Sequence, residues 1–185
     1  MRRPLALILA VLLSAMTFAD EVADRRANAG LRLFRALLAA DIELTKKTVA
    51  PEQILIVFLY VDDKRRATDL ATRFIAEAKE RDKLRGMTIA TEVTNDPSLG
   101  AYGARIPAGV FIAEAPGRPG LSSVIKYGIQ RHVIVYSPYE GHVESGVLGG
   151  LSVEAQVRPY VNRETLEASQ ISLKSFFLGV AKVYQ

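Results

Sequence analysis

Residues 54–61 read ILIVFLYV, a run of eight apolar or aromatic side chains without a charge. A strand with one wet face alternates polar and apolar residues, so an unbroken run indicates a strand that is covered on both faces. Strands of that kind belong to parallel sheets with helices on each side. We therefore expect an α/β chain organised around this strand.

Amphipathic segments lie on both sides of this run. In residues 21–47, apolar side chains recur at three- and four-residue spacing from Leu31 to Ile42, which predicts a helix with one apolar face. Residues 66–84 show the same period and predict a second helix, which Gly86 ends.

The rest of the chain continues the alternation of strands and helices. Strands are predicted at residues 87–93, 109–115 and 132–136, with a short helix at residues 121–130. This order predicts a single-domain three-layer α/β sandwich with a mostly parallel sheet.

The C-terminal third predicts a strand hairpin and a closing helix. Two short strands are expected at residues 147–153 and 157–161, the second suited to an edge by Pro159. Asn162 is a good N-cap, because its side-chain oxygen can accept from an unpaired N–H group in the first turn. Residues 166–184 then carry an apolar stripe near the helical period, with a break expected around residues 169–170.

The N-terminus has the layout of a secretory leader. Met1-Arg2-Arg3 is basic, residues 5–18 are almost wholly apolar, and Ala19 suits a cleavage point. We expect residues 1–19 to be removed and residues 20–185 to form one periplasmic domain without stable membrane insertion. The alternative is an uncleaved anchor, but the apolar run is shorter than the ~20 residues of a spanning helix.

Charge and cysteine content narrow the classes of partner. The formal net charge of +4 includes two arginines of the leader, so it is weak evidence for nucleic acid, which export also disfavours. The chain has no cysteine, so stability rests on core packing without disulfides or thiol chemistry.

Sequence signatures of catalysis are missing. The chain has no G-x-S-x-G elbow, phosphate-binding loop or H-E-x-x-H motif, and only two histidines. We predict a non-enzymatic protein without catalytic residues, cofactor or metal. Asp62 and Asp63 resemble the acidic pair of a receiver domain, but they more simply favour the start of the next helix.

The segment 137–145 (SPYEGHVES) is the most concentrated polar stretch. It follows a predicted strand, at the edge where open α/β sheets bind ligands. In an extended segment Glu140, His142 and Glu144 would share one face, and could then hold a metal for a hydrolase. We weigh that arrangement against a small-ligand contact, which would also use Ser137 and Asp62, and against a plain solvated turn.

Arg158 lies beside Pro159 on the predicted edge strand. It could anchor a carboxylate or a partner protein, or it could discourage edge-to-edge aggregation.

The C-terminal ~40 residues resemble those of the YfiR-like family. Matching positions in the hairpin, strand end and last helix are Gly146, Gly149 or Gly150, Val157, Arg158, Val161, Asn162, Ala181, Lys182 and Val183. Pro159 and Tyr160 depart from the family's preference for Phe and an acid at those positions.

That resemblance implies a periplasmic regulatory protein. Such a protein would bind and restrain an inner-membrane signalling protein, a diguanylate cyclase of the cyclic di-GMP pathway or a sensor kinase, in response to envelope state. An envelope lipoprotein would be a second partner, and a homodimer is left open. The alternative is a periplasmic small-molecule-binding module that works with a transporter or outer-membrane receptor.

Overall fold

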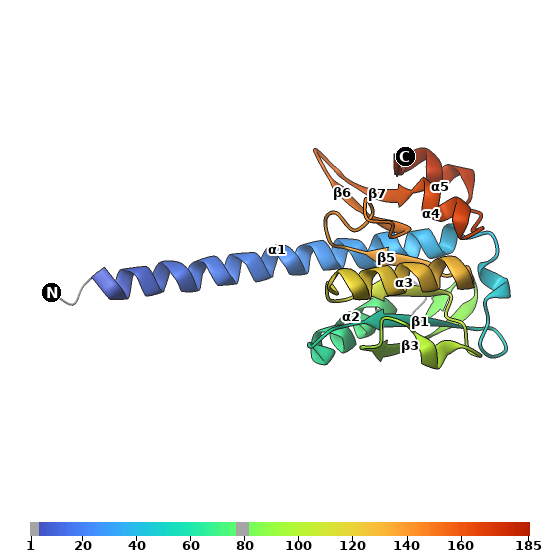
Figure 1. Cartoon of the computed structure of the whole chain (residues 1–185), viewed down its shortest axis with the longest axis horizontal. Coiled ribbons are helices and arrows are strands. Elements are labelled where there is room, and N and C mark those ends of the chain that lie inside the picture. The colour runs from blue at the N-terminus through green and yellow to red at the C-terminus, as the bar shows by residue number, and fades with distance from the viewer. Residues whose placement is uncertain (1–3, 77–81) are drawn as a thin grey trace.

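The computed structural model describes residues 4–76 and 82–185, with side chains from residue 22 onward. Helix α1 (Pro4–Ala40) runs through the predicted leader, and its N-terminal part extends beyond the sheet (Figure 1). The expected cleavage after Ala19 stays a prediction. Where side chains are described, at 22–76 and 82–185, no helix is long and apolar enough to cross a membrane.

The described residues form one sheet of eight strands with helices on both faces (Figure 1). The strands are β1 (Gln53–Leu59), β2 (Lys83–Leu84), β3 (Met87–Thr94), β4 (Gly109–Ile112), β5 (Ile134–Ser137), β6 (Gly149–Val153), β7 (Val157–Asn162) and β8 (Lys182–Tyr184). Their order is β2-β3-β1-β4-β5-β6-β7-β8. Only the β2–β3 and β6–β7 pairs are antiparallel, so the predicted mostly parallel α/β fold is confirmed.

Strand β1 is covered on both faces, as its sequence predicts. Ile54, Ile56 and Phe58 pack into the core on the side of α1 and α2 (Lys64–Ala76). Leu55 and Val57 pack on the opposite side, against α3 (Arg118–Arg131). The unbroken apolar run therefore supplies two separate cores, which gives the three layers.

An aromatic cluster fixes α1 on the sheet. The Phe34 ring lies 5.5 Å from Phe74, 5.6 Å from Phe111 and 5.4 Å from Tyr136. Gly109 makes this close approach possible, because an added Cβ would lie 2.8 Å from Leu38 and 2.9 Å from Phe34. Helix α1 consequently crosses the middle of the sheet and carries its earlier residues to the carboxyl ends of the strands.

The helix predicted at residues 21–47 is too long at its C-terminal end. Helix α1 ends at Ala40, and a 3-10 turn follows at Leu44–Lys46. The cause is a tertiary contact: the Ala40 carbonyl accepts from the N–H of Lys174, and the N–H of Ile42 donates to Ser172. Backbone pairing with a distant segment thus replaces the next helical turn.

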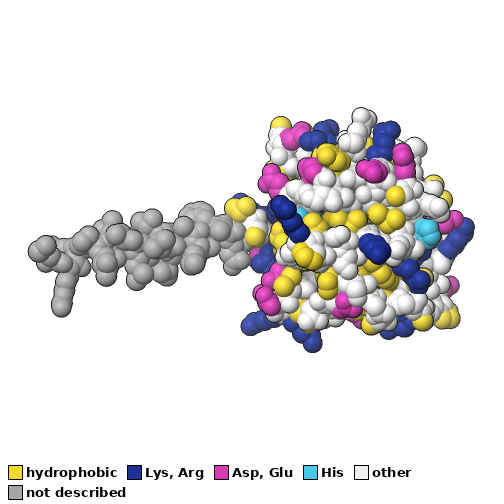
Figure 2. Space-filling model, viewed as in Figure 1, with side chains coloured by type: hydrophobic (Ala, Val, Ile, Leu, Met, Phe, Trp, Pro, Cys, Tyr) yellow, Lys and Arg dark blue, Asp and Glu magenta, His cyan; other side chains and the backbone are white. Residues whose placement is uncertain are grey.

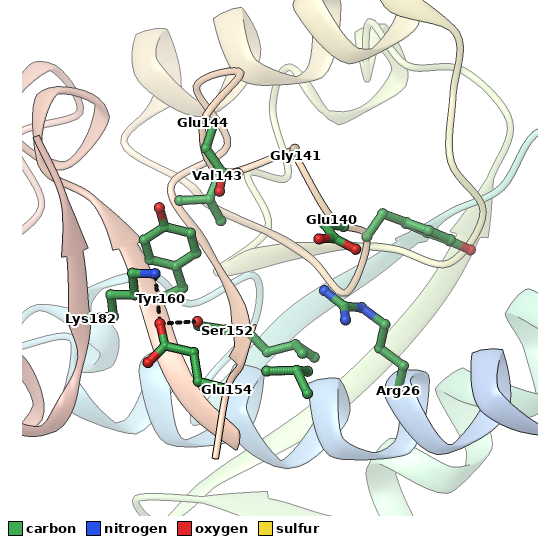
Figure 3. Close-up of a pocket in the computed structure, with 12 residues that line it drawn as sticks. Arg26, Glu140, Gly141, Val143, Glu144, Ser152, Glu154, Tyr160 and Lys182 are labelled. Carbon is green, nitrogen blue, oxygen red and sulfur yellow. Dashed lines mark hydrogen bonds and ion pairs between the residues drawn. The ribbon is translucent and has the colours of Figure 1, made fainter. Parts of the chain in front are cut away.

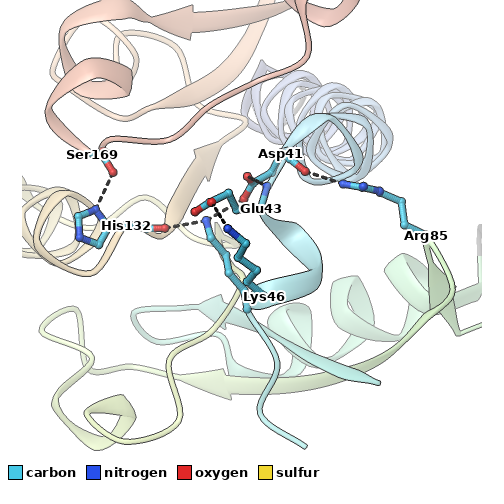
Figure 4. Close-up of polar contacts among 7 residues, drawn as sticks. Asp41, Glu43, Lys46, Arg85, His132 and Ser169 are labelled. Atoms are coloured by element: carbon cyan, nitrogen blue, oxygen red, sulfur yellow. Dashed lines mark hydrogen bonds and ion pairs between the residues drawn. The ribbon is translucent and has the colours of Figure 1, made fainter. Parts of the chain in front are cut away.

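A polar clamp follows α1 at the amino ends of the strands (Figure 4). The Asp41 side chain is 1% exposed and pairs with Lys47 at 2.7 Å. Lys47 also donates to the carbonyl of His132, and the His132 ring donates through Nδ1 to the carbonyl of Ser169. Arg85 donates to the Asp41 carbonyl at 2.6 Å. The clamp joins four distant segments.

Two further helix boundaries are wrong. The helix predicted at residues 66–84 is α2, which ends at Ala76; Lys83–Leu84 pairs with β3, and residues 77–81 lie outside the described residues. The predicted closing helix divides into α4 (Arg163–Ala168), α5 (Ser175–Val180) and strand β8. The break expected at residues 169–170 is confirmed, because Gln170 adopts a left-handed φ of 53°.

Strand β8 explains why the last residues are not helical. Val183 aligns with Val161 of β7, so the end of the chain extends the sheet. This pairing covers Tyr160 to Asn162 but does not reach Pro159, which has no N–H group to offer a neighbour. The predicted edge position of Pro159 is therefore confirmed for the first half of β7 only.

Candidate functional site

The carboxyl end of β1 is closed by a carboxylate of the chain itself. Glu114, just after β4, accepts hydrogen bonds through Oε2 from the N–H groups of Val61, Asp62 and Asp63, at 2.9, 2.8 and 3.0 Å. Burial opposes ionisation of Glu114, but these three donors and Arg66 outweigh it and lower its pKa. Anion ligands often occupy this position in open α/β sheets. Here Glu114 fills it.

The predicted roles of the Asp62–Asp63 pair are thereby separated. Asp63 accepts from the N–H of Arg66 at 2.8 Å and caps the start of α2, as predicted. Asp62 contributes its backbone N–H group to Glu114. Its side chain does not line the cavity described below, so its predicted ligand contact is not supported there.

The polar segment after β5 folds into turns, so its predicted extended form is wrong. The N–H groups of Ser145, Gly146 and Val147 donate to carbonyls three to five residues earlier. Successive side chains consequently do not alternate between two faces. His142 turns inward and lies 2.8 Å from the hydroxyl of the fully buried Ser137, whereas Glu140 and Glu144 face the opposite side.

This geometry does not assemble the three side chains of the metal-site alternative. Among the described residues, no group of three or more His, Cys, Asp or Glu side chains could hold a metal ion. Burial lowers the pKa of His142, against an opposing effect of Glu144. Ser137 also accepts from the N–H of Tyr139 at 3.1 Å. The Ser137–His142 pair therefore holds the turn together.

A cavity of about 430 Å³ lies beside this turn, between α1 and the C-terminal strands (Figure 3). We call it the hairpin pocket. Its walls come from α1, the β5–β6 connection and strands β6 to β8, through Arg26, Tyr139, Glu140, Gly141, Val143, Glu144, Leu151, Ser152, Val153, Glu154, Tyr160 and Lys182. The volume falls within the range of about 300–1,000 Å³ that is usual for small-ligand sites.

Arg26 forms the α1 wall of the hairpin pocket. Its Nε donates to the carbonyl of Pro138, and its guanidinium group points into the cavity toward Glu140 (Figure 3). The bond to Pro138 fixes the plane of the guanidinium group, which leaves the terminal nitrogens directed at the space inside.

The opposite wall is an ion-pair network. Lys182 of β8 pairs with Glu154 at 2.8 Å and lies over the Tyr160 ring at 5.1 Å from its centroid. Arg158 pairs with Glu154 at 3.7 Å from outside the cavity. Burial and the neighbouring Glu144 carboxylate raise the pKa of Tyr160. The predicted contact residue Arg158 thus supports the wall without lining it.

Two buried contacts position the turn that carries Glu140 and Glu144. Asn162 caps α4 by accepting from Thr165 at 2.8 Å, as predicted, and also donates to the carbonyl of Val143 at 2.8 Å. Gly150 lets the turn approach β6, because an added Cβ would lie 2.9 Å from the carbonyl oxygen of Ser137. The turn is therefore attached to the sheet at both ends.

Sequence reasoning found two of the acids in the pocket and missed its other charged residues. Glu140 and Glu144 line it as predicted. Arg26, Glu154 and Lys182 were missed, since they lie on elements far apart in the sequence. The match of Lys182 to a family motif was the only signal near any of them.

Comparisons with known proteins give a likeness of fold. No protein-family model and no curated protein matches the chain. The similarity to YfiR-like proteins consequently stays a prediction.

Two solved structures are similar. One is described as the ABC domain in complex with L-Trp from Streptococcus pneumoniae: TM-score 0.54, 14% identity, covering 80% of this chain and 62% of that one. The other is the ligand-free, open form of a substrate-binding protein with adhesive properties from Clostridium difficile: TM-score 0.50, 14% identity, covering 78% and 58%. The chain thus spans less than two thirds of either structure, and the likeness shows a shared α/β fold.

Proposed function

We propose that this chain is a periplasmic binding module for a small polar molecule and that the hairpin pocket is its ligand site. The pocket itself carries the proposal: about 430 Å³ of space is walled by five ionisable side chains from segments far apart in the sequence. The fold shared with proteins described as ligand-bound or substrate-binding supports it. The leader pattern of residues 1–19 supports the location.

The experiment is a thermal-shift screen of the purified protein against amino acids, sugars, nucleosides and organic acids. A ligand of this pocket raises the melting temperature of the native chain, because it binds the folded state alone. The rise should shrink in Arg26→Gln and persist in Arg32→Gln, a matched change on α1 that does not line the pocket. A screen without any response, or a response equal in both variants, contradicts the proposal.

The second candidate is the regulator that the C-terminal resemblance implies. Exposed apolar side chains favour it: Phe176 is 67% exposed and Val180 58% on the short α5, beside the outermost strand. Apolar groups exposed together mark protein contacts. On the face in view, positive and negative side chains are interspersed, which does not favour a nucleic-acid partner (Figure 2).

Crosslinking in cells tests that candidate. The native protein and Phe176→Ser would be crosslinked and the captured proteins identified. Capture of an inner-membrane cyclase or kinase, reduced by Phe176→Ser, supports the regulator; capture of a transporter or receptor component supports the binding module instead.

A further inference from the structure

The charges of the hairpin pocket do not cancel. Lys182 and Glu154 are paired with each other at 2.8 Å, so each neutralises the other. The remaining ionisable residues that line the cavity are Arg26, Glu140 and Glu144. One guanidinium group against two carboxylates leaves a negative excess, so a complementary ligand carries one anionic group and a larger positive charge.

The two signs also occupy different walls. Arg26 comes from α1, and its guanidinium group is oriented by the bond to the Pro138 carbonyl. Glu140 and Glu144 come from the turn after β5, on either side of Gly141 (Figure 3). A guanidinium group suits a carboxylate, to which it can donate two parallel hydrogen bonds. The acidic turn suits ammonium groups, which only donate.

Apolar side chains complete the cavity between these walls. Val143, Leu151 and Val153 line it together with the charged groups. Val143 and Leu151 are buried, and they offer a surface on which a hydrocarbon stem can lie. A ligand with a carboxylate at one end, amines, and an aliphatic stem meets all three requirements.

We propose that the hairpin pocket binds a basic amino acid, with its carboxylate on Arg26 and its amino groups on Glu140 and Glu144. This assignment rests on the proposed function and specifies its ligand class. Lys182, held by Glu154 and by the Tyr160 ring, forms the far wall without using its charge on the ligand.

Three probes of matched shape test the assignment by calorimetric titration of the purified protein. L-lysine carries the carboxylate, both amines and the stem; L-norleucine lacks the terminal amine; cadaverine lacks the carboxylate. We expect L-lysine to bind at least about tenfold more tightly than either analogue, because each omits one charge-assisted contact. Equal affinity for the three probes would overturn the proposal.

Variants assign the contacts. Glu144→Gln should weaken L-lysine binding by about tenfold or more and leave L-norleucine nearly unchanged. Glu167→Gln, an exposed acid on α4 that does not line this pocket, should alter neither. If L-lysine does not bind, while another compound class stabilises the protein through Arg26, this ligand class is wrong and the binding module stands. If no compound class binds, both proposals fail.

Discussion

The carboxylate of Glu114 lies 2.8 Å from the backbone nitrogen of Asp62, and it accepts from the two neighbouring N–H groups as well. An acid from the end of one central strand thus satisfies the backbone donors at the end of the next. The crevice where open α/β sheets commonly take a ligand is closed by the chain. This closure directs attention to the hairpin pocket, on the other side of β5.

Removing this carboxylate should destabilise the fold. Glu114→Ala leaves three N–H groups without their acceptor and removes a negative charge from the start of α2. We expect a loss of about 1–3 kcal/mol in the free energy of unfolding, measured by urea denaturation. Glu167→Ala, at an exposed position on α4, should change it by less than about 0.5 kcal/mol. Equal losses in the two variants would show that the Glu114 bonds contribute nothing.

Stability should fall in mild acid because of His142. Burial lowers its pKa below the ordinary value, so the unfolded chain binds the proton more tightly than the folded one. Stability from the neutral ring is therefore complete above about pH 6.5 and decreases as the pH falls below it. The lowered pKa values of Glu114 and Asp96 place their own losses at lower pH.

The measurement is the melting temperature of the native protein and of His142→Asn between about pH 7 and pH 5. The native protein should lose stability over this interval more steeply than the variant. Parallel curves would assign the acid sensitivity to other groups.

Gly150 should be intolerant of a side chain. A Cβ there would lie 2.9 Å from the Ser137 carbonyl oxygen, a backbone atom that cannot move without shifting β5. Gly150→Ala should cost about 1–3 kcal/mol, measured by chemical denaturation. Gly179 in α5 has no atom within 4 Å of an added Cβ, so Gly179→Ala should gain about 0.5–1 kcal/mol from helix propensity. A neutral Gly150→Ala would show that the turn is free to move.

The buried ion pair of the polar clamp should matter more than an exposed one nearby. Asp41→Ala leaves Lys47 without its carboxylate and the N–H of Glu43 without its acceptor. We expect a loss of about 3–5 kcal/mol in the free energy of unfolding. Glu43→Ala breaks the exposed pair with Lys46 and should cost less than about 1 kcal/mol. Comparable losses in a urea titration would contradict the burial argument.

Several features of this protein are determined by the sequence alone. The apolar run at residues 54–61 predicts a strand with helices on both sides, and Asn162 predicts the start of α4. These features are local: periodicity and capping depend on residues a few positions apart, and the tertiary structure has only to accept them.

The boundaries and the site were decided by contacts across the sheet. Helix α1 stops at Ala40 because the chain there pairs with residues 172–174, and the end of the chain becomes a strand because β7 offers it a free edge. The hairpin pocket joins Arg26, Glu140 and Lys182, whose proximity no local pattern records. Hydrogen bonds and ion pairs between distant segments form only once the layers have packed, so only the tertiary structure could reveal them.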